Sequence, residues 1–300
     1  MYVITGATGN TGGLIAESLL AKGNKVRVIG RKTERLRHLV DKGAEAFIGS
    51  VSDSAAMIEA FKGAQAVYLM TPPNYTAENP RDYQNSVGKA YADAIRRTGV
   101  AYAVNLSSIG AYLSEKAGPI SGLHDVERQL NQLSGLNIVH LRAAYFMENF
   151  LSNINLIKTQ NAIGSPLRKD LKIPMIDAWD IGEFAAKLLL RLDFSGQSTR
   201  ELLGPAYISM EEAARIIGKA IGKENLNYLQ FTYEQAEQAM TAGGFSQAVA
   251  RSISEMCRAF NEGRVQLLEQ RSKENTTTTS FEKFADCFAA MYRAEDRSAA

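Results

Sequence analysis

The residues most suggestive of chemistry stand near the start of the chain, where a glycine-rich run follows a short apolar segment. The run is Gly6, Ala7, Thr8, Gly9, Asn10, Thr11 and Gly12. Gly6 permits a tight turn, Gly9 lets the backbone approach a pyrophosphate, and Gly12 lets the following helix pack closely on a sheet. The free N–H groups of that helix would attract phosphate. We expect residues 6 and 8–12 to bind a dinucleotide; a purely structural turn is the alternative.

Two cations occupy the position that usually decides between NAD and NADP. Arg31 and Lys32 follow the second apolar segment, and Arg35 comes shortly afterwards. An acidic residue at this point, about 20 residues beyond the glycines, would bind the ribose 2′-hydroxyl of NAD. A guanidinium can instead bind a 2′-phosphate through two parallel hydrogen bonds. The alternative is that these cations are only solvated, but cations near a helix start are unfavourable. We therefore expect NADP(H) to be preferred over NAD(H).

Apolar and helical segments alternate over the first 150 residues, and this alternation predicts the fold. We expect strands at residues 2–5, 25–29, 44–48, 65–70, 101–106 and 137–141, and helices at 13–22, 33–42, from about 53, from 80 to about 99, and at 121–134. Such alternation is typical of βαβ units, which build a parallel sheet with helices on both faces. The predicted class is α/β, with a Rossmann doubly wound parallel sheet.

The pattern changes after residue 150. A strand at 173–176 and a helix at 180–192 are followed by helices at 210–220, 233–241, 246–263 and 281–292. Thr279 and Glu282 would form a capping box, and a frayed tail would follow residue 292. We expect an NAD(P)-binding domain over residues 1–150, completed by about 173–192, and a smaller, mainly helical lobe for substrate or partner in 151–300. Ligands would bind between them, at the carboxyl ends of the strands.

The composition excludes several other classes of function. The chain has 34 basic and 32 acidic residues, so nothing indicates the basic face that nucleic acid requires. No apolar run approaches the ~18 residues of a membrane span, and no signal peptide is recognisable, so we expect a cytoplasmic protein without a membrane partner. Cys257 and Cys287 are expected to be buried small apolar residues. The three histidines are scattered, which predicts no metal site, and His38 and His140 are expected to be structural.

Longer motifs resemble the NmrA-like branch of the atypical short-chain dehydrogenase/reductases. In chain order they are GATGNTGG, GRKTERL, LMTPP, NLSSIGAY, HDVERQL and LRAAYFMENF. Weaker similarity continues through IDAWDIGEFAAKLL and ISMEEAARIIGKAIGK to TTTTSFEKFA, so the resemblance covers nearly the whole chain. It implies a Rossmann fold and a nicotinamide cofactor that acts without metal or flavin.

The resemblance also implies a catalytic arrangement, from which this sequence departs. A serine that holds the substrate carbonyl would be Ser107 or Ser108. A Tyr-x-x-x-Lys pair begins at Tyr112, but this is too close to the serines. Aligning the family's lysine-x-x-Glu pattern places His124 at the lysine position and Ile120 at the tyrosine position. The usual proton donor is therefore missing. We expect His124 to orient the nicotinamide ribose or to donate a proton near neutral pH; a structural hydrogen bond is the alternative.

Further cofactor contacts are implied by position within the family pattern. They are Ser50 and Val51 at the adenine, Met70, Thr71, Pro72 and Pro73 at the ribose on the nicotinamide side, and Tyr145 and Phe146 at the nicotinamide and a flat acceptor. The family commonly has an aspartate where Ser50 stands. Tyr145 and Phe146 could equally belong to the core. Asn85 matches a family asparagine that supports the sheet, and Asp53 and Glu127 are expected in the first turns of helices.

Two functions fit these observations. The first is an NADPH-dependent reductase of quinone-like or other conjugated acceptors, because aromatic delocalisation makes hydride transfer to such a substrate easier. The second is a non-catalytic, NADP(H)-sensing regulatory protein that acts through a protein partner, since one scaffold supports both outcomes. An epimerase or dehydratase of a nucleotide sugar is disfavoured without a tyrosine-lysine pair in register.

Overall fold

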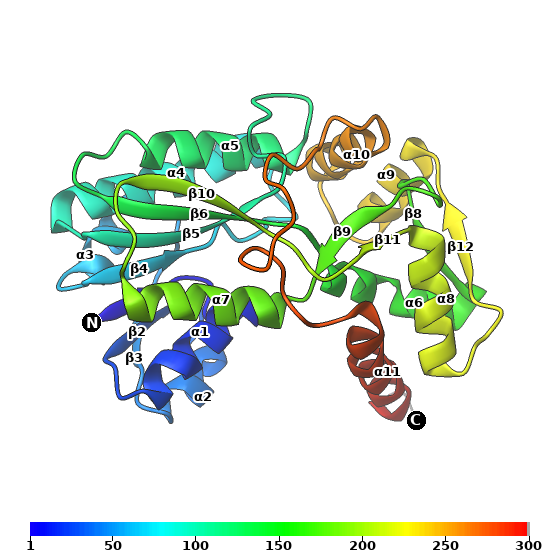
Figure 1. Cartoon of the computed structure of the whole chain (residues 1–300), viewed down its shortest axis with the longest axis horizontal. Helices are drawn as coiled ribbons and strands as arrows, with labels where there is room; N and C mark the ends of the chain where they lie inside the picture. Colours follow the sequence, from blue (N-terminus) through cyan, green and yellow to red (C-terminus); the bar gives the residue numbers. More distant parts are fainter. Residues whose placement is uncertain (299–300) are drawn as a thin grey trace.

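The computed structural model describes residues 1–298 and shows a large parallel sheet beside a smaller lobe (Figure 1). The sheet has seven strands in the order β10-β6-β5-β4-β1-β2-β3. Their bounds are Tyr2–Ile4 (β1), Val26–Gly30 (β2), Glu45–Ile48 (β3), Ala66–Leu69 (β4), Tyr102–Ser108 (β5), Asn137–Ala143 (β6) and Gln197–Leu202 (β10). All neighbouring strands in it are parallel. The strand order reverses between β1 and β4, which is the switch point where open α/β sheets bind ligands. The predicted doubly wound fold is confirmed.

Helices cover both faces of this sheet. One face carries α1 (Asn10–Ala21), η1 (Thr33–Leu36), α2 (Arg37–Val40) and α7 (Ala178–Arg191), and the other carries α3 (Ser54–Phe61), α4 (Pro80–Thr98) and α5 (Pro119–Leu130). Because successive strand residues face opposite sides, Val3 packs with the second group of helices and Ile4 with the first. Burial on both faces explains the continuous apolar runs of these strands.

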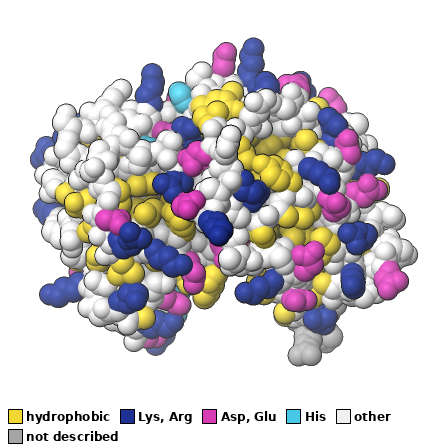
Figure 2. Space-filling model, in the orientation of Figure 1, with side chains coloured by type: hydrophobic (Ala, Val, Ile, Leu, Met, Phe, Trp, Pro, Cys, Tyr) yellow, Lys and Arg dark blue, Asp and Glu magenta, His cyan; other side chains and the backbone are white. Residues whose placement is uncertain are grey.

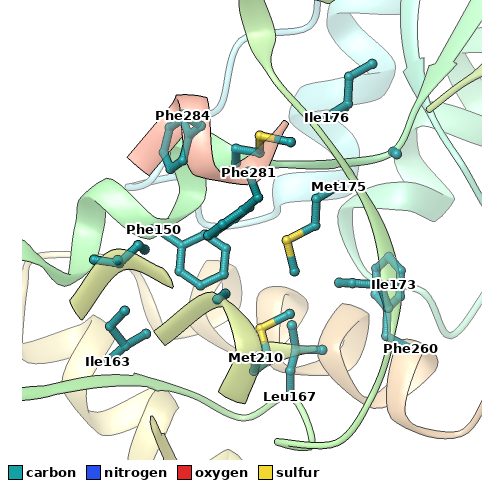
Figure 3. Packing of buried hydrophobic residues seen from close by; sticks show 14 of the residues in the cluster. Phe150, Ile163, Leu167, Ile173, Met175, Ile176, Met210, Phe260, Phe281 and Phe284 are labelled. Atoms are coloured by element: carbon teal, nitrogen blue, oxygen red, sulfur yellow. The ribbon is translucent and has the colours of Figure 1, made fainter. Parts of the chain in front are cut away.

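The smaller lobe has a core of its own, which is rich in aromatic residues (Figure 3). Its elements are β7 (Tyr145–Phe146), η2 (Met147–Asn153), α6 (Ile154–Gln160), β8 (Ala162–Ser165), β9 (Ile173–Ile176), β11 (Tyr207–Ile208), α8 (Met210–Ile221), β12 (Asn227–Gln230), α9 (Tyr233–Ala242), α10 (Gln247–Asn261) and α11 (Phe281–Ser298). Phe281 and Phe284 bring α11 onto this core, and the ring centroids of Phe281 and Phe150 lie 5.3 Å apart. The last helix therefore closes the lobe.

Most departures from the sequence prediction lie after residue 143. Strand β10 was not predicted, because five of the six residues in its sequence, QSTREL, are polar. The predicted capping box is wrong: the backbone N–H and hydroxyl of Thr279 both donate to the carboxylate of Asp180, over 3.0 and 2.8 Å. Ser280 instead accepts from the Lys283 N–H. The predicted frayed tail is also wrong up to Ser298, since α11 continues to that residue; positions 299–300 lie outside the described residues.

The surface charges and the two cysteines agree only in part with what we predicted from the composition. On the face in Figure 2, basic side chains are interspersed with acidic ones. Cys257 is buried, which raises the pKa of its thiol to about 12, but Cys287 is exposed, so the expectation that both are buried is wrong for Cys287. Neither cysteine is in a disulfide. None of the helices within residues 1–298 is both long and apolar enough to cross a membrane.

Candidate dinucleotide site and active site

The glycine turn joins β1 to α1 at the switch point of the sheet. Gly6 has a φ of +62°, a left-handed conformation that favours glycine. A Cβ on Gly12 would lie 2.5 Å from the carbonyl oxygen of Gly6, so only glycine allows α1 to start this close to the strand. Gly9 is the N-cap of α1 and no side chain caps the helix. The first N–H groups of α1 thus keep the capacity to bind phosphate oxygens.

The side chains of the turn divide into two groups. Thr8, Gly9 and Asn10 are exposed, where a cofactor could contact them. Thr11 is buried, and its hydroxyl accepts a hydrogen bond from the Tyr68 hydroxyl over 3.0 Å. Only the backbone of Thr11 is therefore available to a phosphate, while its side chain anchors α1 to β4.

The residues expected at the adenine end lie on neighbouring strand ends. Gly30 of β2 is paired with Ile48 of β3, which brings exposed Arg31 and Lys32 to the same edge as Ser50. Burial raises the pKa of Tyr83 on α4, and the charge of Arg31 acts in the opposite direction, so the guanidinium is near this hydroxyl. Tyr83 was missed by sequence reasoning, because only the fold brings α4 to this edge.

The residues expected beside the nicotinamide ribose follow β4. The Met70 N–H donates to the Thr5 hydroxyl over 2.8 Å, and the Met70 carbonyl accepts from the Tyr91 hydroxyl over 2.7 Å. The hydroxyl oxygen of Thr71 is buried without a hydrogen-bond partner among the described residues. A buried hydroxyl normally has a partner. A ribose hydroxyl or carboxamide would supply one, so the residues at this position fit a nicotinamide nucleotide.

Ser107 does not point toward a substrate. Its hydroxyl donates to Oε1 of Glu127 over 2.6 Å, and Glu127 also receives two hydrogen bonds from Arg142, at 3.0 and 2.6 Å. All three residues are buried. The expectation that Glu127 lies in the first turn of a helix is wrong, since it stands near the end of α5. The Ser107 hydroxyl holds this carboxylate, whereas the hydroxyl of half-buried Ser108 donates to the Ile109 carbonyl over 3.0 Å.

His124 lies on α5 at the position where the family pattern has lysine. Its Nδ1 is 2.9 Å from the carbonyl oxygen of Ala111. A carbonyl oxygen can only accept, so Nδ1 carries the proton and Nε2 of a neutral ring remains an acceptor. Ile120, at the tyrosine position, is buried in the core of the smaller lobe. The histidine has both the anchoring bond of the structural alternative and a second nitrogen available for chemistry.

The out-of-register Tyr-x-x-x-Lys has a structural role. The Tyr112 hydroxyl donates to the Arg264 carbonyl over 2.7 Å and accepts from the Gln266 N–H over 2.9 Å. Lys116 is exposed, and its carbonyl accepts from Arg264. These bonds tie the loop before α5 to the segment after α10, and they leave the tyrosine without a role as proton donor.

The aromatic pair expected at the nicotinamide is largely turned into the smaller lobe. The ring of Tyr145 packs edge-on against Phe150 and Phe260, with centroids 6.3 and 6.4 Å away. Its hydroxyl is near Cys257, and burial raises the pKa of this hydroxyl. Phe146 is half-buried against the same core. The alternative that this pair belongs to the core has the stronger support.

Three other expectations concern structural residues. Asp53 caps α3 as predicted, accepting from the N–H groups of residues 55 and 56. His140 is structural as predicted: both ring nitrogens bond to asparagine side chains, and burial lowers its pKa to about 4. Asn85 does not support the sheet; it donates to Asp125 and accepts from Gln129, which joins α4 to α5.

Glu148 was missed by sequence reasoning and stands close to the switch point. Its Oε1 accepts from the Ala178 N–H over 2.9 Å at the start of α7, and its Oε2 is buried without a partner among the described residues. Burial raises the pKa of Glu148 to about 7. A Cβ on Gly182, one turn further along α7, would lie 3.2 Å from the Thr11 carbonyl. Glu148 could have been found from the helix expected near residue 180, whose first N–H groups need acceptors.

The strand order, the helices on both faces and the glycine turn at the switch point define a Rossmann-type α/β protein. The model of the NmrA-like family matches residues 2–286. The chain therefore belongs to the NmrA-like family, as its motifs predicted. Among residues 1–298, no three His, Cys, Asp or Glu side chains are grouped so that they could hold a metal ion.

Known proteins similar to the chain include reductases of several acceptors. The NAD(P)H azoreductase of Xenophilus azovorans is 25% identical over 258 residues, which cover 85% of this chain and 86% of the azoreductase. The Escherichia coli NADPH-dependent quinone oxidoreductase complexed with NADPH has a TM-score of 0.78 at 21% identity, covering 96% of this chain and 99% of its own. The Citrobacter sp. triphenylmethane reductase complexed with NADP(H) has a TM-score of 0.77 at 21% identity, covering 96% and 100%. The two solved structures share the fold of this chain.

Proposed function

We propose that this protein is an NADPH-dependent reductase of quinone-like or other conjugated acceptors that works without metal or flavin. The observation that carries the proposal is the start of α1, which lies at the switch point without a side-chain cap. Its N–H groups would bind the pyrophosphate, and Arg31 and Lys32 would bind the 2′-phosphate. When bound there, NADPH supplies the hydride. The azo, quinone and dye reductases similar to this chain support the proposal.

The acceptor class follows from the missing tyrosine. Reduction of an isolated ketone requires a well-placed acid, but the family's tyrosine position holds buried Ile120. In a conjugated acceptor, delocalisation stabilises the charge that hydride transfer creates, so a weaker proton source is enough. His124, which stands at the family's lysine position and is held by Ala111 through Nδ1, is the residue we assign as this proton source. Nε2 would accept a hydrogen bond when the ring is neutral and donate a proton when it is charged.

The test is NADPH oxidation by the purified protein with quinones, azo dyes and triphenylmethane dyes, and with simple ketones as matched unconjugated acceptors. Trp179 is the one tryptophan in the sequence and lies in the first turn of α7, the helix whose Gly182 packs against the Thr11 carbonyl, so its fluorescence should report cofactor binding independently. We expect binding, turnover of conjugated acceptors and little turnover of ketones. Binding without turnover of any acceptor would contradict the reductase, and absence of binding would contradict the cofactor site.

A further inference from the structure

An aromatic pair joins the loop after β4 to the smaller lobe. Tyr75 lies between β4 and α4, and Phe245 lies between α9 and α10. Their rings are stacked, with centroids 4.5 Å apart and an angle of 26° between the ring planes. Tyr75 is exposed and Phe245 is half-buried, and neither packs into the hydrophobic cores of residues 1–298. The contact is therefore made at the surface, by two parts of the chain that are far apart in the sequence.

Ser246 holds the loop that carries Tyr75. The Ser246 N–H donates to the Tyr75 carbonyl over 2.8 Å, and the Ser246 hydroxyl donates to the Ala77 carbonyl over 2.6 Å. The hydroxyl oxygen also accepts from the Val249 N–H over 3.1 Å, which makes Ser246 the N-cap of α10. Because these bonds tie the loop to the start of a helix, the Tyr75 ring is held in place although it is exposed.

The Tyr75 ring can bind another flat molecule on the face that is turned away from Phe245. Phe245 covers one face of the ring, yet Tyr75 is 49% exposed. The Tyr75 hydroxyl forms no hydrogen bond with any residue from 1 to 298. Aromatic rings attract other flat π systems through offset stacking, and a ring that is already held in place loses little conformational entropy on binding. The pair therefore has the geometry of a stacking surface.

The loop that carries Tyr75 begins at the proposed nicotinamide site. It leaves β4 through residues 70–73, which we assign to the ribose on the nicotinamide side, and the buried hydroxyl of Thr71 lacks a partner among the described residues. Tyr75 is four residues beyond Thr71, so their Cα atoms are at most about 14 Å apart. The Tyr75 ring is therefore close enough to contact an extended conjugated acceptor that lies against the nicotinamide.

The helix that Ser246 caps also contacts the loop that precedes the helix of His124. Glu255 of α10 accepts from the Gly118 N–H over 3.1 Å, and Gly118 is the N-cap of α5, which carries His124. Helix α10 thus connects the loop that carries Tyr75 with the loop that leads to the proposed proton source.

We propose that the Tyr75 ring is the stacking surface for the conjugated acceptor and that Phe245 is the positioning residue that holds this ring. The proposal rests on the proposed reductase function and adds a determinant of acceptor choice. Tyr145 and Phe146 are poorly placed for this role, because they are directed largely into the smaller lobe. A flat conjugated acceptor would gain the contact with Tyr75, whereas a non-planar acceptor would not.

Equilibrium binding of acceptors to the full chain tests this proposal without turnover. The protein would be saturated with NADP⁺, which has no hydride to donate, and titrated calorimetrically with two flat acceptors, anthraquinone sulfonate and methyl red. Tyr75→Leu keeps an apolar side chain against Phe245 but removes the flat ring, and it should raise the Kd of both acceptors about 3–10-fold. Tyr75→Phe keeps the ring and should bind both acceptors as the wild type does.

Phe245 acts through Tyr75, so the effects of the two substitutions should not be additive. Phe245→Leu alone should weaken acceptor binding, but adding it to Tyr75→Leu should change the Kd little further. Phe194→Leu is the matched control and should leave the Kd unchanged. The Phe194 ring packs edge-on against Tyr102, with centroids 5.5 Å apart, where β5 begins at the opposite end of the sheet. The affinity for NADP⁺ should be the same in all variants.

Either of two results would overturn the proposal. The first is wild-type acceptor affinity in Tyr75→Leu, which would show that the aromatic pair only joins the loop to the lobe. The second is the absence of saturable binding of either acceptor to the wild type. NADPH oxidation decides the proposed function separately. Turnover by the wild type with an unchanged acceptor Kd in Tyr75→Leu would keep the reductase and reject the stacking surface, and acceptor binding that depends on Tyr75 without turnover would do the reverse.

Discussion

A Cβ atom on Gly12 would stand 2.5 Å from the carbonyl oxygen of Gly6, so these two glycines set how closely α1 approaches the end of β1. The oxygen belongs to the backbone and cannot yield without moving the turn. We therefore expect Gly12→Ala to lower the free energy of unfolding by about 1–3 kcal/mol, as overpacking does. The displaced turn should also lose NADPH. Urea unfolding and fluorescence titration with NADPH measure the two effects.

Gly9→Ala is the matched control, because it adds the same methyl group where there is room for it. The nearest atom to that Cβ would be the Gly6 carbonyl oxygen at 3.4 Å, and the φ of Gly9 is −102°, which alanine adopts freely. We expect wild-type stability within about 1 kcal/mol but weaker NADPH binding, because the methyl group occupies the approach to the pyrophosphate. Unchanged NADPH affinity would show that phosphate does not bind at this turn.

The cations after β2 should distinguish NADPH from NADH. Replacing both Arg31 and Lys32 by Ala should raise the Kd for NADPH about 10–100-fold, because charge-assisted bonds to the 2′-phosphate are lost. NADH, which lacks that phosphate, should be affected much less. Arg37→Ala removes a neighbouring exposed cation and should leave both affinities unchanged. An equal loss for both cofactors would refute the assignment.

His124 should affect the rate of reduction more than cofactor binding. We expect His124→Ala to lower kcat by about 100-fold, which is typical for loss of an acid-base group, while the Kd for NADPH changes little. Steady-state kinetics with a quinone and fluorescence titration provide the two readouts. If kcat is unchanged, the bond to Ala111 is the residue's whole role.

Tyr112→Phe tests whether the tyrosine of the out-of-register Tyr112–Lys116 pair takes part in the reaction. The substitution removes the hydroxyl that bonds to Arg264 and Gln266 but no group assigned to the chemistry. We expect a loss of stability of about 1–2 kcal/mol with kcat unchanged. A large fall in kcat at unchanged stability would make Tyr112 a catalytic candidate again.

Sequence patterns predicted the sheet well because its strands are buried on both faces and their neighbours are set by βαβ connections. Strand β9 of the smaller lobe was also predicted, with the bounds that it has, Ile173–Ile176. Strand β10 was not, since its position at the sheet edge allows polar residues. The capping error at Thr279 has a different reason: the carboxylate of Asp180, 99 positions away in the sequence, binds Thr279 in place of a local cap, and the local sequence does not indicate this contact.

The parts of the candidate site that depend on local backbone geometry could be predicted from the sequence. The parts that depend on contacts between residues distant in the sequence could not. The glycine turn could be predicted because its glycines stand where two stretches of backbone lie too close together for a side chain, as at Gly12 and the Gly6 carbonyl. The serine pair illustrates the opposite case. Ser107 and Ser108 are adjacent, yet only the partner on α5 shows that Ser107 is directed into the protein, toward Glu127. The orphan oxygen of Glu148 likewise depends on the helix packed beside it.

The buried pair of Arg142 and Glu127 should make a large contribution to stability when one partner is removed. Arg142→Met leaves the Glu127 carboxylate buried with only the Ser107 hydroxyl, and we expect a loss of about 3–5 kcal/mol. Arg200→Met is the matched control, because its contact with Glu269 is long, at 3.8 Å, and partly exposed. That change should be less than about 1 kcal/mol. Equal losses in urea unfolding would contradict a special role for the buried pair.

Glu148 should make stability depend on pH in a definite direction. Its pKa is raised from 4.5 to about 7 in the fold, so between these values the folded chain holds a proton that the unfolded chain has released. The folded state is then favoured at low pH, and the Glu148 contribution is lost as pH rises through about 7. Glu148→Gln keeps an acceptor for the Ala178 N–H but cannot ionise. This substitution should leave the free energy of unfolding nearly unchanged at about pH 4.5 and raise it by up to about 3 kcal/mol at about pH 8.

Urea unfolding across this pH range measures the difference, with Glu183→Gln, an exposed position on α7, as control. A difference between wild type and Glu148→Gln that stays constant with pH would show that this carboxyl ionises normally in the folded protein.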